Sequence, residues 1–323
     1  MAAPVQVLGI SNAIVDVLSH VDEAFLKRLG AAKSSMVLID QARAKEIYGM
    51  IGPATEMSGG SVANSIANVA NLGGSTAYIG CVANDQLGGI FNHDMKSLGV
   101  DIRLPPRSGG APTACCYVLI TPDGERTMQT YLGACTELGV ADVTERTIGS
   151  PKVVLLEGYL WDIPQGPAAL RKAMEIAKRN GSIVAISLSD AECVSRHKAE
   201  FLDALANYAG MIFANEHEIM RLLDAKAFDE AAKTAARHDS VTFILTRSEK
   251  GSVIVKGRET VVQAAFPIKK LVDATGAGDS YTAGFLYAWT SGRALRDCAE
   301  LGTRCAASVI QQVGARLEKD FKA

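Results

Sequence analysis

The second half of the chain alternates short apolar runs with longer amphipathic stretches, and this rhythm constrains the fold more than any other feature. The apolar runs predict strands at 153–156, 183–188, 211–214, 241–246 and 252–255. The stretches between and after them predict helices at 166–180, 198–206, 229–236, 281–290 and 295–313. Strands separated by helices imply an α/β fold, with a central, mostly parallel sheet flanked by helices on both faces. The segments 14–40 and 103–132 read instead as hairpins, so we expect a single domain, 1–323, into which they insert a small β lid.

The composition of the chain narrows the class of protein. Its 323 residues are 48% hydrophobic and 21% charged with a net charge of −2, which predicts a globular protein whose main partner is not nucleic acid. Seven cysteines lack any C-x-x-C pair, which favours buried thiols over a zinc or redox site and leaves the role of Cys115 and Cys116 open. We find neither a secretory leader nor an apolar run long enough for a bilayer, so we expect a cytoplasmic location without membrane contact.

The run Leu271–Phe285 carries the clearest chemistry in the chain. Gly276, Ala277 and Gly278 precede Asp279 at the head of a helical pattern. Small residues let backbone N–H groups approach an anion, and a helix start adds unpaired N–H groups and the positive end of a dipole. A carboxylate beside a phosphate makes sense if it accepts a proton from an attacking hydroxyl. An ordinary glycine-rich turn with Asp279 as helix cap is the alternative.

Two further polar groups lie in the first half of the chain. The pair Gly59-Gly60 precedes a helical pattern in which Ser61 and Asn64 can form hydrogen bonds, although Ser61 suits a plain helix cap equally. Asn12 and Asp16 lie four residues apart in an apolar stretch. A carboxylate there needs donors if it is buried, and an acceptor-only group suits a pair of ribose hydroxyls. Asp16 at a strand end that faces water is the other interpretation.

Several common signatures are absent from the sequence. There is no G-x-x-x-x-G-K-[ST], no G-x-G-x-x-G after the first strand, no G-x-S-x-G and no H-E-x-x-H. These absences exclude a P-loop enzyme and leave a nicotinamide-dependent oxidoreductase without its fingerprint.

The whole run Leu271–Phe285 resembles the C-terminal motif of the ribokinase-like carbohydrate and nucleoside kinases, and the resemblance extends over essentially the whole chain. It implies a ribokinase-like fold, ATP as phosphate donor and Mg²⁺ as metal. It also implies that Asp279 is the catalytic base and that Gly276, Ala277 and Gly278 form the anion hole. Dependence on a monovalent cation such as K⁺ stays open, as does the choice between monomer and homodimer.

Two motifs are similar to those of the adenosine kinases within this family. These are Asn12-Ala-Ile-Val-Asp16 and Gly59-Gly60-Ser61, where ribokinases proper usually have a lysine at the position of Ser61. The resemblance implies that Asn12, Asp16, Gly59, Gly60, Ser61 and Asn64 hold a ribose. The implied activity is phosphorylation of the 5′-hydroxyl of adenosine to give AMP, a purine salvage reaction.

The resemblance also assigns residues to ATP and Mg²⁺. Asn215 and Glu218 match an Asn-x-x-Glu motif that binds Mg²⁺ through water, although the segment also reads as a polar helix start. Arg126 matches a lid arginine that reaches the transferring phosphate, with a solvated hairpin arginine as the alternative. The residues implied on the ATP side are Asn215, Thr246, Gly251, Thr275, Gly276, Gly278 and Cys305.

A mainly apolar set is the candidate for holding the base, or else belongs to the core: Met36, Cys116, Leu132, Tyr159 and Leu160. Vertebrate-type adenosine kinases have two phenylalanines near the position of Tyr159-Leu160, so this chain departs from them and the base stays open. The alternatives are an inosine or guanosine kinase, a ribose or fructose kinase of the same family, and a non-catalytic nucleoside-binding regulatory protein. The intact Asp279 argues against the last, because pure binding needs no base.

Overall fold

A nine-stranded sheet forms the larger layer of the molecule. The computed structural model describes residues 4–318 and 321–323, so residues 1–3 and 319–320 of the predicted domain lie outside it. The strand order is β14-β13-β12-β11-β10-β9-β1-β5-β6, and only β13 runs antiparallel to the other strands. The strands are β1 (Val7–Ile10), β5 (Thr76–Ile79), β6 (Asp101–Ile102), β9 (Val153–Glu157), β10 (Ile183–Ser187), β11 (Ala209–Asn215), β12 (Thr242–Thr246), β13 (Ser252–Lys256) and β14 (Glu259–Gln263).

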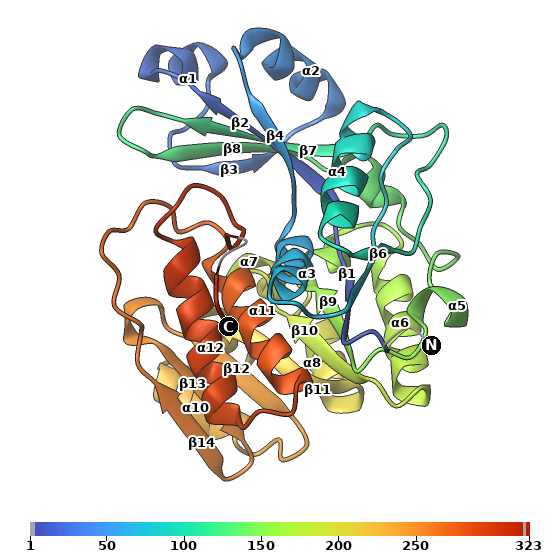
Figure 1. Cartoon of the computed structure of the whole chain (residues 1–323), viewed down its shortest axis with the longest axis vertical. Coiled ribbons are helices and arrows are strands. Elements are labelled where there is room, and N and C mark those ends of the chain that lie inside the picture. Colours follow the sequence, from blue (N-terminus) through green and yellow to red (C-terminus); the bar gives the residue numbers. More distant parts are fainter. Residues whose placement is uncertain (1–3, 319–320) are drawn as a thin grey trace.

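Helices cover both faces of this sheet (Figure 1). One face carries α3 (Ser61–Asn71), α4 (Gln86–Ser97), α11 (Ala277–Thr290) and α12 (Leu295–Val309). The other face carries α5 (Glu145–Ile148), α6 (Gly166–Arg179), α7 (Ala191–Arg196), α8 (Lys198–Asn207), α9 (Glu216–Leu222) and α10 (Phe228–Ala235). Leu155 and Phe213 join the first core, and their neighbours Leu156 and Ile212 join the second. Strand side chains alternate between faces, so strands covered on both sides must be apolar throughout.

A separate five-stranded sheet, here called the small sheet, stands beyond the carboxyl ends of the central strands (Figure 1). Its order is β3-β8-β7-β2-β4, built from β2 (Ile14–His20), β3 (Met36–Leu38), β4 (Thr55–Gly59), β7 (Ala114–Ile120) and β8 (Arg126–Tyr131). The helices α1 (Glu23–Leu29) and α2 (Gln41–Met50) pack on its Val15 and Val17 face. The opposite face of the small sheet therefore looks toward the large layer.

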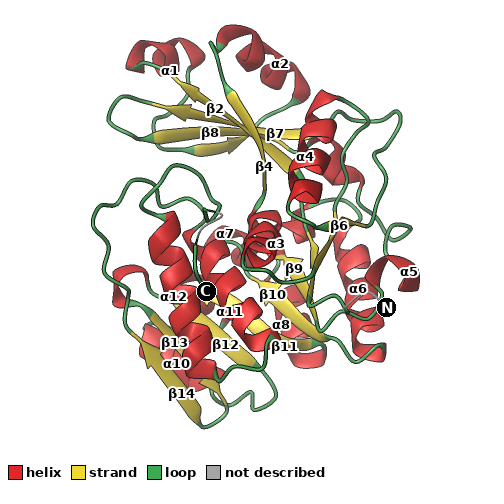
Figure 2. Cartoon of the chain, in the orientation of Figure 1, coloured by secondary structure: helices red, strands yellow, loops and turns green. Residues whose placement is uncertain are grey.

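The predicted mostly parallel sheet with helices on both faces is confirmed (Figure 2). The elements that were not predicted are α1, α2, β4, β6, α5, α7, β14 and the 3₁₀ helices η1 (Gly133–Glu137), η2 (Gly158–Asp162) and η3 (Ser248–Lys250). Among the helices predicted for the second half of the chain, two limits were wrong: α11 begins at Ala277 instead of 281, and α12 ends at Val309 instead of 313. The early start of α11 matters, since it brings Asp279 into the first helical turn. Over residues 4–318 and 321–323, no helix has the length and apolar character needed to cross a membrane.

Candidate active site

The loop that precedes α11 is shaped for close approach by an anion. Gly276 is the N-cap residue in the left-handed conformation, with φ 74°, and a Cβ there would lie 2.4 Å from the Cβ of Ala315. Glycine is therefore required at this position. The first helical turn leaves the N–H groups of Gly278 and Asp279 without helical partners, and Gly278 is exposed. This arrangement can bind a phosphate.

A cavity of about 250 Å³, here called the phosphate cavity, lies in front of this loop. Residues from β10, β11, β12 and the first turns of α3, α9 and α11 line it: Ser61, Ser187, Ser189, Asn215, Glu218, Thr246, Ala274, Gly276, Ala277, Gly278, Asp279 and Thr282. The carboxyl ends of parallel strands thus meet three helix N-termini in one place, which is where open α/β sheets bind ligands.

Asp279 is held in the phosphate cavity by two donors from α3. The hydroxyl of Ser61 donates to its Oδ1 at 2.7 Å, and Nδ2 of Asn64 donates to its Oδ2 at 3.3 Å. Burial raises the pKa of Asp279 to about 6, although these two hydrogen bonds and the charge of Arg316 act in the opposite direction. Such a carboxylate is ionised at neutral pH and still basic enough to accept a proton from an alcohol in a transition state.

A second carboxylate, Asp16 of β2 in the small sheet, lies near enough to Asp279 for the two charges to interact. Burial raises its pKa to about 6; the charges of Arg316 and Arg126 lower it, and that of Asp279 raises it further. Asp16 lies inside β2, is only partly exposed and pairs with Met57 and Cys116 of the neighbouring strands, so the alternative of a strand-end aspartate in open water is wrong. A Cβ on Gly59 would lie 2.3 Å from the Asp16 Oδ2, so the glycine makes room for this carboxylate.

Asn12 and Gly60 lie in close contact. A Cβ on Gly60 would lie 2.5 Å from the backbone oxygen of Asn12, and Gly60 has φ 97°. The Asn12 side chain donates from Nδ2 to Glu157 at 2.8 Å. Among the residues that the structure describes, its buried Oδ1 has no hydrogen-bond partner. A buried acceptor of this kind can be satisfied by a ligand hydroxyl.

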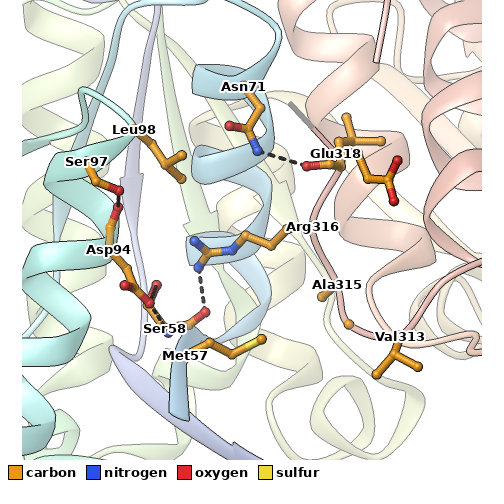
Figure 3. Close-up of a pocket in the computed structure, with 12 residues that line it drawn as sticks. Met57, Ser58, Asn71, Asp94, Ser97, Leu98, Val313, Ala315, Arg316 and Glu318 are labelled. Carbon is orange, nitrogen blue, oxygen red and sulfur yellow. Dashed lines mark hydrogen bonds between the residues drawn. The ribbon is translucent and has the colours of Figure 1, made fainter. Parts of the chain in front are cut away.

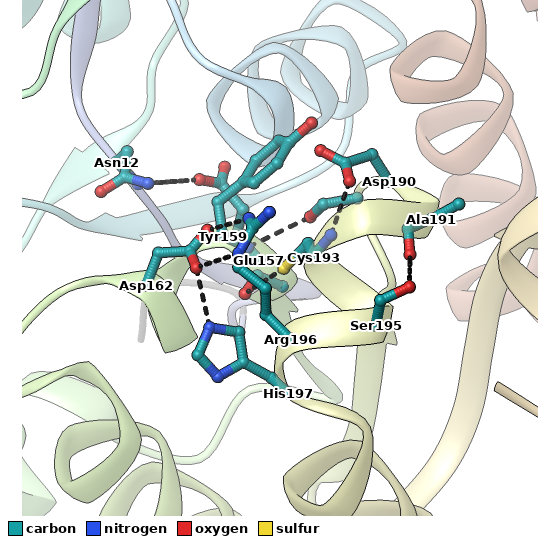
Figure 4. A network of polar contacts seen from close by, with 12 residues as sticks. Asn12, Glu157, Tyr159, Asp162, Asp190, Ala191, Cys193, Ser195, Arg196 and His197 are labelled. Atoms are coloured by element: carbon teal, nitrogen blue, oxygen red, sulfur yellow. Dashed lines mark hydrogen bonds and ion pairs between the residues drawn. The ribbon is translucent and has the colours of Figure 1, made fainter. Parts of the chain in front are cut away.

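Glu157, at the end of β9, is a site residue that the sequence analysis missed. It is 1% exposed, and besides Asn12 it accepts from the N–H of Val62 at 3.1 Å (Figure 4 shows the Asn12 contact). Burial raises its pKa to about 7, against the hydrogen bonds from Val62 and Asn12, and the charge of Asp279 raises it further. A carboxylate directly after an apolar strand was the available signal.

Arg126 links the small sheet to the anion loop. Its Nη2 lies 2.6 Å from Oδ2 of Asp273, and its Nη1 donates to the hydroxyl of Thr275 at 3.3 Å. The side chains of Arg126 and Asp273 are 13% and 4% exposed, so the alternative of a solvated hairpin arginine is wrong. The guanidinium lies beside the loop that precedes α11, but it is already paired with the carboxylate of Asp273.

Arg316, in the segment after α12, is the second residue that the sequence analysis missed. Its Nη2 donates to the backbone oxygen of Ser58 at 2.7 Å, as Figure 3 shows. Its Nε donates to Oδ1 of Asn64 at 3.3 Å. No motif surrounds it in the sequence, and only the fold brings it to α3.

A larger cavity of about 480 Å³ adjoins the phosphate cavity. Its lining is mostly apolar and consists of Asn215, Thr246, Ser248, Glu249, Gly251, Ala265, Phe266, Ile268, Leu271, Ala274, Ala277, Gly278, Tyr281, Thr303, Ala306, Ala307 and Ile310. Asn215, Thr246, Ala274, Ala277 and Gly278 belong to both cavities. An apolar cavity that opens onto an anion loop has the size and character expected for a nucleotide base. Two of the predicted ATP-side residues in the loop before α11 lie outside this cavity: Thr275 lies beside Arg126, and Gly276 lines the phosphate cavity alone.

Cys305 does not reach this cavity. It is fully buried on the face of α12 that packs against Gly284 of α11. Thr303, Ala306, Ala307 and Ile310 line the cavity instead, because they share the opposite face of the same helix turn. The prediction for Cys305 is corrected accordingly.

Asn215 and Glu218 form a capping box at the start of α9. Oδ1 of Asn215 accepts from the N–H groups of His217 and Glu218, and Glu218 accepts from the N–H of Asn215 at 2.9 Å. Burial raises the pKa of Glu218 to about 7, against hydrogen bonds from Asn215. Both residues line the phosphate cavity, so the polar helix start also presents oxygen atoms there. Such oxygens fit a hydrated Mg²⁺, whose inner ligands are largely water and phosphate.

The predicted base-binding set divides in the structure. Cys116 lies beside Asp16 in register and belongs to an apolar patch with Ile14, Leu18, Val118, Ile120 and Met128; Met36 pairs with Met128 and is half exposed. Leu132 follows β8 and is partly exposed. Tyr159 is the second residue of η2, and its N–H donates to the hydroxyl of Ser189 at 3.3 Å. Leu160 is 1% exposed within the core between η2 and α6, so that prediction is corrected.

Comparison with known proteins agrees with this geometry. Residues 35–320 match the model of the family described as pfkB family carbohydrate kinase. The structure of adenosine kinase from Sinorhizobium meliloti is 45% identical with a TM-score of 0.89, covering 98% of this chain and 96% of that one. A probable sugar kinase from Rhizobium etli CFN 42 is 44% identical, also with a TM-score of 0.89, covering 97% and 95%. Adenosine kinase 1 of Arabidopsis thaliana is 23% identical over 95% of this chain and 94% of its own length. The predicted ribokinase-like fold is confirmed.

Proposed function

This chain belongs to the pfkB family of carbohydrate kinases, and we propose that it transfers the γ-phosphate of ATP to the 5′-hydroxyl of adenosine, giving AMP. Membership makes it a phosphotransferase with an alcohol acceptor. The observation that carries the finer proposal is the proximity of two carboxylates, those of Asp279 and Asp16. Asp279 lies at the anion loop, and Asp16 lies beside an apolar patch that suits a base.

Asp279 is the proposed catalytic base. It takes the proton of the 5′-hydroxyl as the new bond from that oxygen to the γ-phosphorus forms and the bond from the γ-phosphorus to the bridging oxygen of ADP breaks. Ser61 and Asn64 aim the carboxylate. The backbone at Gly276, Ala277 and Gly278 stabilises the charge on the transferring group, with Arg126 beside it. Positioning and electrostatics are the main contributions that a protein makes to this reaction.

Mg²⁺ would be held near Asn215 and Glu218, where it would neutralise phosphate charge. The ATP base is assigned to the apolar cavity that Thr246 and Gly251 help to line.

Asp16 is the proposed ribose ligand. Its carboxylate can accept from the 2′- and 3′-hydroxyls, and the unpartnered Oδ1 of Asn12 offers a further acceptor. The patch around Cys116 and Val118 offers an apolar surface for a purine. A free sugar would leave this patch without a partner. The small sheet then acts as a lid whose closure excludes water from the reaction.

A sugar kinase of the same family is the second candidate, because one relative at 44% identity is described as a probable sugar kinase. The deciding experiment measures ADP formation from Mg-ATP with adenosine, inosine, guanosine, cytidine, ribose and fructose. We expect strong turnover on adenosine and little on free sugars, with Asp279→Asn as the inactive control. Turnover on a free sugar alone would overturn the nucleoside proposal and leave the base assignment intact.

A further inference from the structure

The segment that follows α12 is fixed against α3 by side-chain amides. Nδ2 of Asn68 donates to the backbone oxygen of Ala315 at 3.1 Å, and its Oδ1 accepts from the N–H of Leu317 at 2.8 Å. The backbone on both sides of Arg316 is therefore held in place. Arg316 projects from this segment toward the first turn of α3 (Figure 3).

The hydrogen bonds of Arg316 determine which way the amide of Asn64 faces. An amide side chain has one oxygen that accepts and one nitrogen that donates. Oδ1 of Asn64 accepts from Nε of Arg316, and Nδ2 consequently donates to Asp279. The second contact of Arg316, to the backbone oxygen of Ser58, fixes the guanidinium plane. Without the guanidinium, the amide is free to turn its oxygen toward the carboxylate, where two acceptors would repel each other.

The charge of Arg316 also acts on the carboxylates that surround it. Carboxylates face it from three elements: Asp94 of α4, Asp16 of β2 and Asp279 of α11. Burial lowers the pKa of Arg316 while these three charges raise it, and an arginine in a protein stays protonated. Arg316 lowers the pKa of both Asp16 and Asp279. It is thus the positive group common to the two carboxylates of the proposed site.

We propose that Arg316 is a positioning residue for phosphoryl transfer: its guanidinium orients Asn64 toward Asp279 and supplies the positive charge that faces the two cleft carboxylates. This inference rests on the proposed function, since it assigns a role within the same site. Arg316 itself touches neither the reacting hydroxyl nor the phosphate. It acts through Asn64 and through its charge.

The test compares Arg316→Met and Arg316→Lys by the pH dependence of kcat, with Arg107→Met as a matched control. Arg107 is also partly buried and paired, with Asp142 at 2.6 Å, but lies outside the site. We expect Arg316→Met to lower kcat at pH 7 by about tenfold to a hundredfold, the usual effect of a lost charge-assisted hydrogen bond.

The acid limb of the pH profile of kcat distinguishes the effect of the Arg316 charge from its effect on the orientation of Asn64. The groups that face Asp279 are Asp16, Glu157 and Arg316. Removing the positive charge leaves two carboxylates, so in Arg316→Met the acid limb should move to higher pH. Arg316→Lys should keep the limb near its wild-type position while kcat stays reduced, because lysine lacks the planar fork. Arg107→Met should change neither quantity.

A double-mutant cycle with Asp279→Asn, read by urea unfolding at pH 7, gives a measure that needs no turnover. Arg316→Met should cost less stability in the Asp279→Asn background than in the wild type. Zero coupling together with a wild-type pH profile would overturn the inference. If Arg316→Met does not fold, an Arg316→Lys enzyme with wild-type kcat would overturn it too. A wild type that phosphorylates only a sugar refutes the nucleoside proposal, and the same profiles are then measured with that sugar.

Discussion

Replacing Asp279 by asparagine should abolish turnover and at the same time stabilise the fold. The folded environment raises the pKa of this carboxyl to about 6, mainly through burial, whereas the unfolded chain leaves it near its ordinary value of about 4. The fold therefore favours the protonated carboxyl. That favourable contribution is complete below about pH 4 and is lost as the pH rises through 6. At pH 7 the ionised carboxylate is a net cost to stability.

The size of the effect follows from the pKa shift and the contacts. A rise of about two pKa units corresponds to about 3 kcal/mol at pH 7. Asparagine keeps an acceptor for Ser61 but presents a donor to Nδ2 of Asn64, whose Oδ1 is already engaged by Arg316; the lost hydrogen bond costs about 1 kcal/mol. Partial solvent exposure reduces the remainder further. We expect a gain of about 1 to 2 kcal/mol, or about 1.5 to 3 °C in Tm for a chain of 323 residues.

The assay is urea unfolding of wild type and Asp279→Asn between pH 4 and pH 8. The gain should be absent at pH 4 and reach its full size above pH 7. Asp85→Asn is the matched control of opposite sign: burial raises the pKa of Asp85, but hydrogen bonds from Thr113 and Gly88 outweigh burial and lower it overall. That variant should lose stability at pH 7 and lose less as the pH falls. An Asp279→Asn protein less stable than wild type at pH 7 would refute the reasoning.

Three other substitutions test the site. Gly276→Ala forces an alanine into φ 74° and against Ala315, so urea unfolding should show a loss of about 1 to 3 kcal/mol from backbone strain alone, and unchanged stability would contradict the close approach. Asp16→Asn should weaken adenosine binding by about tenfold or more without changing ATP affinity, measured by titration calorimetry; equal adenosine affinity would move the ribose site elsewhere. Arg126→Met leaves the buried Asp273 without its ion partner, so Tm should fall by several degrees, corresponding to about 3 kcal/mol or more, and a wild-type Tm would show that the pair contributes nothing.

The sequence predicts the strands that are buried on both faces better than the rest of the fold. β9 contains the apolar run Val153–Leu156 and β12 the apolar run Phe243–Leu245, and such runs are typical of strands covered on both faces. β4 was missed because Thr55–Gly59 is mostly polar, and α2 was missed because only Ala44 and Ile47 are buried. The small sheet is covered by short helices on one face alone, so its strands lack the uniform signal.

The residues of the candidate site also differ in how well the sequence predicts them. Asp279 was accessible to prediction because its neighbours in sequence are also its neighbours in the site. The roles of Glu157 and Arg316 depend on α3, which the fold brings to them from 95 and 252 residues away. The prediction for Cys305 assigned the wrong face of α12 to the cavity. Thr303 and Ala306 face the cavity, whereas the side chain of Cys305 faces Gly284.

The distances in sequence that separate the partners of Asp279 also govern when activity can appear during folding. Ser61 and Asn64 reach this carboxylate across 218 and 215 positions. Contacts between such remote segments carry a large loop-closure cost and form late. A partly folded chain therefore has helices and strands before it has an aimed base.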